Sequence, residues 1–306
     1  MPIDHHRYIR SLAPLAALAL TAWAALVSPA HAAPDRFQDL QVEVIGSGRP
    51  VLMIPGLNSG ADAWRDTCTA LQPQVQCHLV QLPGFAGAPA VASDDFLVAM
   101  RDRLLAYADA RQLDHPAVIG HSLGGVLALQ MAIAAPDRVG PLVIVDALPY
   151  LDAIRDPGAT PALRKAAAAQ ERSTLLAMEE APYRANTDRF LASMTRSPRH
   201  LSTLQQWGRD SDRATTANAM YAMSMTDLRE PVAAITAPVL VLGAWAAYQP
   251  FGATLESTRA IFAAQYARVP SARIAMSDTG YHFLMWDDPQ WLQAQVRGFL
   301  DLPARR

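Results

Sequence analysis

The 306-residue chain has few cysteines, few charged residues and no excess of basic residues. Its two cysteines are too few to supply by themselves the four ligands of a structural zinc site. Charged residues make up 18% of the chain and the formal net charge is -2, so the basic excess typical of nucleic-acid-binding proteins is missing. We therefore expect no nucleic-acid partner, and small neutral or apolar ligands fit this composition better.

Hydrophobic residues make up 51% of the sequence, which is enough for a large core in one α/β domain or in one domain with an insertion. Apolar runs typical of strands occur at 41–45, 51–54, 77–82, 117–119, 142–145, 239–242 and 273–276. Most are continuously apolar, as expected for strands buried on both faces. Helical patterns lie between them, so we predict an α/β fold with a mostly parallel central sheet flanked by helices.

The first 32 residues have the pattern of a secretory signal peptide. Arg7 and Arg10 precede an apolar run at 12–27, and Ala30-His31-Ala32 fits a cleavage site, so we interpret residues 1–32 as a signal peptide. The apolar run is short for a membrane span, which makes a retained anchor the less favoured alternative. The predicted location is periplasmic or secreted, with no stable membrane insertion after the signal is removed.

The two cysteines, Cys68 and Cys77, lie close together in the sequence. An exported protein meets an oxidising compartment, in which one bridge that closes a short loop is expected. Two free, buried thiols are the alternative. We predict a disulfide between them.

The alternation of strands and helices stops between Asp146 and Thr236. This segment is helix-like and too long for a connecting loop. We interpret residues 148–230 as a helical cap inserted over the carboxyl ends of the strands, with 33–147 and 231–306 as the core. Several methionines in the cap can line a pliable acyl or aromatic pocket, although packing between helices is the simpler interpretation for most of them.

One serine lies between glycines in the stretch AVIGHSLGGVLAL, residues 117–129. An apolar run precedes it and a helical pattern follows, so the chain must turn sharply at Ser122. The segment GHSLG at 120–124 fits the G-x-S-x-G nucleophile elbow, whose glycines let a strand and a helix approach closely. A serine that only caps the helix is the alternative.

With this motif, the chain from about Phe37 to its end resembles a capped α/β-hydrolase. In that family the nucleophile, here Ser122, is followed by an acid at a later strand end and finally by a histidine. His282 alone follows the last predicted strand, in the loop DTGYHFLMWDDP, where the family places the general base. The mature chain has four other histidines. His78 and His115 are expected at strand starts, at the end of the sheet opposite the site. His121 fills a variable position of the elbow, and His200 is expected in the cap.

The acid departs from the commoner pattern of the family. After the strand at 239–242 the family usually offers an aspartate, but GAWAAYQPFGATL contains no acidic residue before Glu256. Asp146 closes the strand PLVIVD after the elbow helix, a location from which some members, including haloalkane dehalogenases, take their acid. Asp278 is near the histidine in sequence and is the alternative, although it can point away. Asp146 is therefore the predicted acid.

An oxyanion hole needs two backbone N–H donors aimed at the developing negative charge. The resemblance implies the amide of Leu123, next to the nucleophile, and the amide of Leu57, after the strand at 51–54. The segment IPGLNSGADAW resembles the family's H-G-x7-W segment, with Pro55 in place of the usual histidine and Trp64 as an expected core residue. Because the donor is the amide of Leu57, this replacement alters packing around the site more than its chemistry.

The resemblance implies acyl transfer to water through an acyl-enzyme, with an ester hydrolase as the default. A serine at the elbow argues against the dehalogenase and epoxide-hydrolase branches, which use an aspartate nucleophile. Amidase, lactonase, thioesterase and peptidase activities stay open, because the fold does not fix the substrate. A non-catalytic binding protein with this fold is the remaining hypothesis. No metal or organic cofactor is required, and the expected partner is a small-molecule ester or related acyl substrate.

Overall fold

The structure is a computed structural model that describes Met1, residues 35–154 and residues 156–303. Apart from Met1, the predicted signal peptide at 1–32 lies outside the described residues, so its cleavage and the predicted location stay predictions. Among the described residues, no helix combines the length and the apolar character that crossing a membrane requires.

The described strands form one eight-stranded sheet with the order β1-β2-β4-β3-β5-β6-β7-β8. β1 pairs with β2 and β2 with β4 in antiparallel fashion, and the other neighbours are parallel. The strands are β1 (Asp35–Phe37), β2 (Leu40–Gly46), β3 (Arg49–Ile54), β4 (Val75–Gln81), β5 (Ala117–His121), β6 (Leu142–Val145), β7 (Val239–Gly243) and β8 (Ala272–Met276). The predicted α/β fold class is confirmed, and β1 adds an edge strand that the sequence analysis did not predict.

The central strands β3 to β7 bury apolar side chains on both faces of the sheet. In β3, Leu52 and Ile54 pack into the core on one face, whereas Val51 and Met53 pack into the core on the other. Because side chains alternate along a strand, one continuous apolar run supplies both cores. The first core is covered by α2 (Phe96–Ala110), α3 (Leu123–Ala134) and α8 (Leu255–Gln265), and the second by α1 (Arg65–Leu71) and α10 (Pro289–Phe299).

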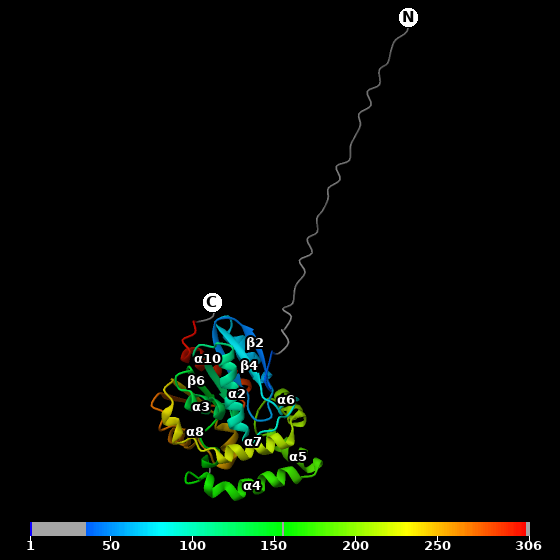
Figure 1. Ribbon diagram of the computed structural model, residues 1–306, viewed down its shortest axis with the longest axis vertical. Coiled ribbons are helices and arrows are strands. Elements are labelled where there is room, and N and C mark those ends of the chain that lie inside the picture. The colour runs from blue at the N-terminus through cyan, green and yellow to red at the C-terminus, as the bar shows by residue number, and fades with distance from the viewer. Residues whose placement is uncertain (2–34, 155, 304–306) are drawn as a thin grey trace. The chain divides into compact units, whose positions relative to one another are not determined.

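Between β6 and β7 the chain forms a helical insertion of α4 (Pro161–Ala177), α5 (Glu180–Leu191), α6 (Pro198–Asp210) and α7 (Arg213–Met225). Figure 1 shows these helices gathered at one end of the core, with α4 outermost. The limits of the predicted cap at 148–230 and of the two core segments remain predictions, because residues 33–306 make up one compact unit.

Backbone hydrogen bonds attach the helical insertion to the loop after β4. The N–H of Asp212, between α6 and α7, donates to the carbonyl of Gly84 (2.8 Å), and the N–H of Gly87 donates to the carbonyl of Asp210 (3.0 Å). Gly84 has a φ of 79°, and a Cβ atom there would lie 2.6 Å from the side chain of Thr215. A glycine is needed at this point because the insertion packs directly on the backbone.

One of the two histidines expected at strand starts, His78, differs from expectation, whereas His115 lies just before β5 as expected. His78 lies in the middle of β4 and not at its start, because the strand begins at Val75. Its Nδ1 atom lies 2.8 Å from the hydroxyl of Tyr107, and burial lowers the pKa of His78 to about 4, so the ring is neutral near pH 7. His115 is exposed in the loop before β5 and contacts Asp114 (2.6 Å).

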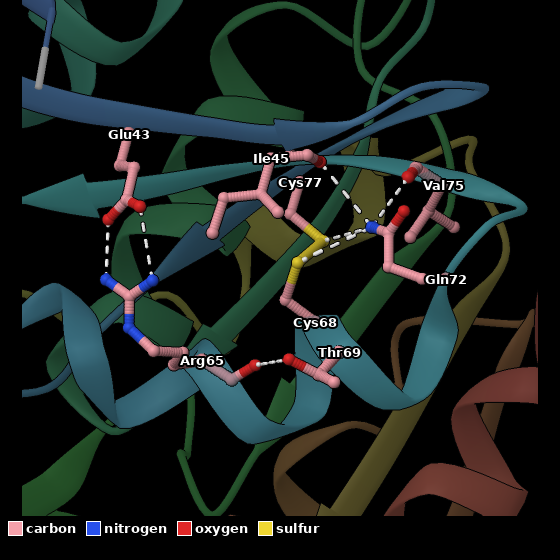
Figure 2. Close-up of a disulfide and its surroundings, with 8 residues drawn as sticks. All are labelled: Glu43, Ile45, Arg65, Cys68, Thr69, Gln72, Val75 and Cys77. Atoms are coloured by element: carbon pink, nitrogen blue, oxygen red, sulfur yellow. Dashed lines mark hydrogen bonds and ion pairs between the residues drawn. A yellow bond between two sulfur atoms is a disulfide. The ribbon is translucent and has the colours of Figure 1, made fainter. Parts of the chain in front are cut away.

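Cys68 and Cys77 form a disulfide that connects α1 to β4 (Figure 2). Both residues are fully buried, and the amide nitrogen of Gln72 lies 3.6 Å from each sulfur. Nearby, Arg65 of α1 binds Glu43 of β2 (2.6 Å), so a second contact joins the same helix to the sheet. The predicted pairing is therefore present in the structure.

The double substitution Cys68→Ala/Cys77→Ala should lower the free energy of unfolding by about 2–3 kcal/mol, because the bridge restricts the unfolded chain. Urea denaturation of oxidised wild type and variant measures the difference. Added reductant should destabilise the wild type and leave the variant unchanged. Two alkylated cysteines in denatured, non-reduced wild type would contradict the pairing.

Candidate active site

β5 ends in a sharp turn at Ser122, and α3 begins at the next residue. Ser122 has φ 51° and ψ -120°, a combination that residues other than glycine rarely adopt. Its N–H donates to the carbonyl of Val145 (2.9 Å), and its carbonyl accepts from the N–H of Gly125 (2.8 Å). The serine side chain is partly exposed and makes no capping hydrogen bond to α3, so the helix-cap alternative is not what the structure contains.

Two glycines allow this turn, because backbone atoms of neighbouring segments occupy the space that a side chain at either position would need. A Cβ atom at Gly120 would lie 2.2 Å from the carbonyl oxygen of Gly124, and a Cβ atom at Gly124 would lie 2.3 Å from the carbonyl oxygen of Ile54. The end of β5, the start of α3 and the end of β3 therefore approach more closely than any side chain would permit.

Asp146 and His282 meet at the carboxyl edge of the sheet, although they are 136 residues apart. Asp146 follows β6, and His282 lies in the loop after β8. Nδ1 of His282 lies 2.6 Å from Oδ2 of Asp146, whose side chain is 6% exposed. With Nδ1 donating to the carboxylate, Nε2 of the imidazole is left for a second partner.

The alternative acid, Asp278, is exposed in the turn after β8. Its carboxylate has no hydrogen-bond or ion-pair partner among the residues that the structure describes. The structure thus brings His282 to Asp146 and not to Asp278.

The end of β7, the commoner position for the acid, carries the buried residue Ala244. Its N–H donates to Oδ1 of Asp146 (2.8 Å), while the N–H of Asp146 donates to the carbonyl of Leu242 (2.7 Å). Asp146 adopts a left-handed φ of 45°, which aspartate tolerates better than most residues. The end of β7 therefore supplies a backbone donor that orients the carboxylate of the neighbouring strand.

The predicted oxyanion donors, Leu57 and Leu123, lie at the same edge of the sheet. Leu57 follows β3, which pairs with β5, and Leu123 is the first residue of α3. A Cβ atom at Gly56 would lie 3.2 Å from Cβ of Ser122, so the turn before Leu57 adjoins the elbow. Trp64 is fully buried, as expected. The use of the two amides as donors stays a prediction.

A carboxylate in α9 (Leu284–Asp287) connects the loop after β8 to the helical insertion. This loop carries His282 and is called the histidine loop below. Asp287 accepts hydrogen bonds from the hydroxyl of Thr195 (2.7 Å) and the N–H of Arg196 (3.0 Å), both between α5 and α6. It also accepts from the N–H of Tyr281 (3.2 Å), next to His282. No sequence pattern pointed to this contact, because its partners lie far apart along the chain.

Aromatic rings extend from the elbow to α6. The ring centroid of His121 lies 4.5 Å from that of His282 and 4.6 Å from that of Phe283. Phe283 stacks on Trp286 at 4.8 Å, and Trp286 stacks on His200 of α6 at 4.4 Å. His200 is in the insertion, as expected, and through these rings it is connected to the histidine loop.

Tyr266 is a fully buried neighbour of the acid. Its hydroxyl donates to the carbonyl of Ala147 (2.9 Å), the residue after Asp146. Burial, and then the charge of Asp146, raise the pKa of the Tyr266 phenol well above its ordinary value, so it remains a neutral donor. Within the described residues, no group of three or more His, Cys, Asp or Glu side chains could hold a metal ion.

Comparison with known proteins gives one family and several relatives. The profile of the Alpha/beta hydrolase family matches residues 51–294. "Putative carbamate hydrolase RutD" of Azorhizobium caulinodans is 27% identical over 266 residues, which are 85% of this chain and 94% of that protein. A pimeloyl-[acyl-carrier protein] methyl ester esterase of Aliivibrio salmonicida is 33% identical over 104 residues, 34% of this chain and 38% of that protein. The enol-lactonase of Burkholderia xenovorans LB400 has the same fold, with a TM-score of 0.71, 16% identity and coverage of 86% of this chain and 96% of that chain.

Gly124→Ala should lower the free energy of unfolding by at least about 2 kcal/mol, because the new Cβ atom would overlap a backbone carbonyl that cannot move freely. Gly298→Ala is the matched control, since a Cβ atom there meets nothing within 4 Å in α10. It should stabilise the protein by up to about 1 kcal/mol. Urea denaturation of both variants checks this, and equal effects would contradict the close approach at the elbow.

Proposed function

This chain belongs to the alpha/beta hydrolase family, and from that premise we propose that it is a serine hydrolase that cleaves carboxylic esters through Ser122, His282 and Asp146. One observation carries the proposal: the 2.6 Å contact between Nδ1 of His282 and Oδ2 of Asp146, at the same sheet edge as the strained turn at Ser122. The relatives named as a methyl ester esterase and as "Putative carbamate hydrolase RutD" support hydrolysis as the reaction class.

In the proposed acylation step, Oγ of Ser122 attacks the ester carbonyl carbon while Nε2 of His282 takes its proton. Asp146 holds the tautomer that keeps Nε2 free and stabilises the imidazolium. The amides of Leu57 and Leu123 donate to the negatively charged oxygen of the tetrahedral intermediate. When this intermediate collapses, the carbon–oxygen bond to the alcohol breaks, and the imidazolium returns its proton to the leaving alcohol.

In the proposed deacylation step, water attacks the acyl carbon and His282 takes a proton from it. The bond between the acyl group and Ser122 then breaks, and the imidazolium gives its proton to the serine oxygen. The carboxylic acid leaves, and the enzyme returns to its starting state. Apart from the substrate and water, this chemistry needs only groups of the protein itself.

Amides, lactones, thioesters and peptides can be cleaved by the same triad, so they are alternative substrate classes. Carbamates are the alternative with a specific observation in its favour, because the RutD relative matches 85% of this chain. Rates on p-nitrophenyl esters of increasing chain length, beside carbamate, amide, lactone and thioester substrates, would rank these classes.

We also propose a periplasmic or secreted location. The signal-like pattern in residues 1–32 supports export, and the disulfide between Cys68 and Cys77 fits an oxidising compartment. Cell fractionation combined with N-terminal sequencing of the exported protein tests it.

A fluorophosphonate probe should label the wild type at Ser122, because a base activates this serine alone in the proposed mechanism. Ser122→Ala should lose both labelling and ester turnover while its circular dichroism stays unchanged. Labelling that persists in folded Ser122→Ala would refute the assignment. A wild type that neither labels nor turns over any substrate would favour a binding protein.

Asp146→Asn should keep the fold and lower kcat by about 10⁴-fold, because the amide no longer selects the tautomer that can accept the serine proton. Asp278→Asn is the matched control and should retain wild-type kcat. Steady-state ester hydrolysis by both variants measures the contrast. The reverse result, an active Asp146→Asn and an inactive but folded Asp278→Asn, would show that Asp278 is the acid.

A further inference from the structure

His121 is fully buried and directly precedes Ser122, but the elbow motif gives it no role. Its Nε2 atom lies 3.0 Å from the backbone carbonyl oxygen of His282. Since a carbonyl only accepts hydrogen bonds, Nε2 must carry the hydrogen. The other ring nitrogen, Nδ1, is buried and has no hydrogen-bond partner among the described residues. The hydrogen bond that this ring donates is therefore directed to the backbone of His282.

This bond joins the two segments that carry the reacting groups. His121 is the last residue of β5, whereas His282 follows β8, and β6 and β7 lie between these strands in the sheet. The histidine loop must therefore reach back across two strand ends. Asp146 binds the side chain of His282 through Nδ1. A second bond, to the carbonyl oxygen of the same residue, restrains the backbone from which that side chain extends.

The surroundings of His121 keep it in the form that can donate this bond. Burial, and then repulsion from the ring of His282 whenever that ring carries a proton on both nitrogens, lower the pKa of His121 well below its ordinary value. The two rings are in contact, with centroids 4.5 Å apart. A neutral His121 adds no positive charge beside the imidazolium that the proposed mechanism forms.

We propose that His121 is a positioning residue that holds the backbone of His282, and with it the base, at a fixed distance from Ser122. This inference rests on the proposed function. This positioning role of His121 differs from simple core packing. A packing role depends on the shape of the side chain, whereas the positioning role depends on a hydrogen-bond donor at the place of Nε2.

Two polar substitutions of similar character separate these roles. In His121→Gln the amide nitrogen can reach the place of Nε2, whereas in His121→Asn it reaches only the place of Nδ1. The glutamine variant should keep kcat within a few-fold of wild type. The asparagine variant should lose roughly 10- to 100-fold in kcat with KM unchanged, because the base is displaced while the binding surface is not.

Ester hydrolysis is measured with both variants well below their melting temperatures. Wild-type kcat in folded His121→Asn, or an equal loss in both variants, would overturn the proposal. If either variant fails to fold, ¹⁵N shifts of the unmodified protein decide: the Nε2–H tautomer of His121 supports the proposal and the Nδ1–H tautomer overturns it. A wild type without turnover or fluorophosphonate labelling would instead refute the proposed function.

Discussion

The hydrogen bond between Asp146 and His282 is the interaction on which the rest of the candidate site depends. It connects the end of β6 to a loop after β8, so it forms only when β6, β7 and β8 pair in the observed register. A slip of one residue would turn the carboxylate to the opposite face of the sheet. The intervening strand also takes part, because Ala244 at its end donates an N–H to the second oxygen of the same carboxylate. The sheet thus fixes the orientation of the acid before any loop is considered.

The helical insertion contributes to this geometry as well as covering one end of the core. Asp287 is close to His282 in the chain, and it accepts a hydrogen bond from Thr195 in the connection between α5 and α6. In the loop after β3, the hydroxyl of Thr216 in α7 donates to Oδ1 of Asn58 (2.7 Å), the residue after Leu57. The loop with the candidate base and the loop with a candidate oxyanion donor are therefore both tied to the insertion.

The sequence predicted those features that leave a local pattern. Seven strands were predicted because each has a run rich in apolar residues, and most of these runs are continuously apolar. Asp35–Phe37 is a short, partly exposed edge strand without such a signal. Asp146 could be selected because the next strand end has no acid, and because the resemblance includes family members that take their acid from the strand after the elbow helix. The contacts of Ala244, Asp287 and His121 could not be predicted. Almost every residue has a backbone N–H, so the sequence does not mark the one at Ala244 as a donor. The contacts of Asp287 and His121 join segments far apart in the chain, so no local pattern indicates them.

The buried neighbours of the acid and the base also determine where charge can develop. His121 and Tyr266 carry ionisable side chains, but burial lowers the pKa of the first and raises that of the second, so both are neutral donors to backbone carbonyls. Neither adds a charge beside Asp146 or His282. The positive charge that the proposed mechanism places on His282 therefore has the carboxylate of Asp146 as its directly bonded counter-charge. Because the side chain of Asp146 is only 6% exposed, that attraction is stronger than it would be between two fully solvated groups, and it favours the imidazolium at the moment when Ser122 gives up its proton.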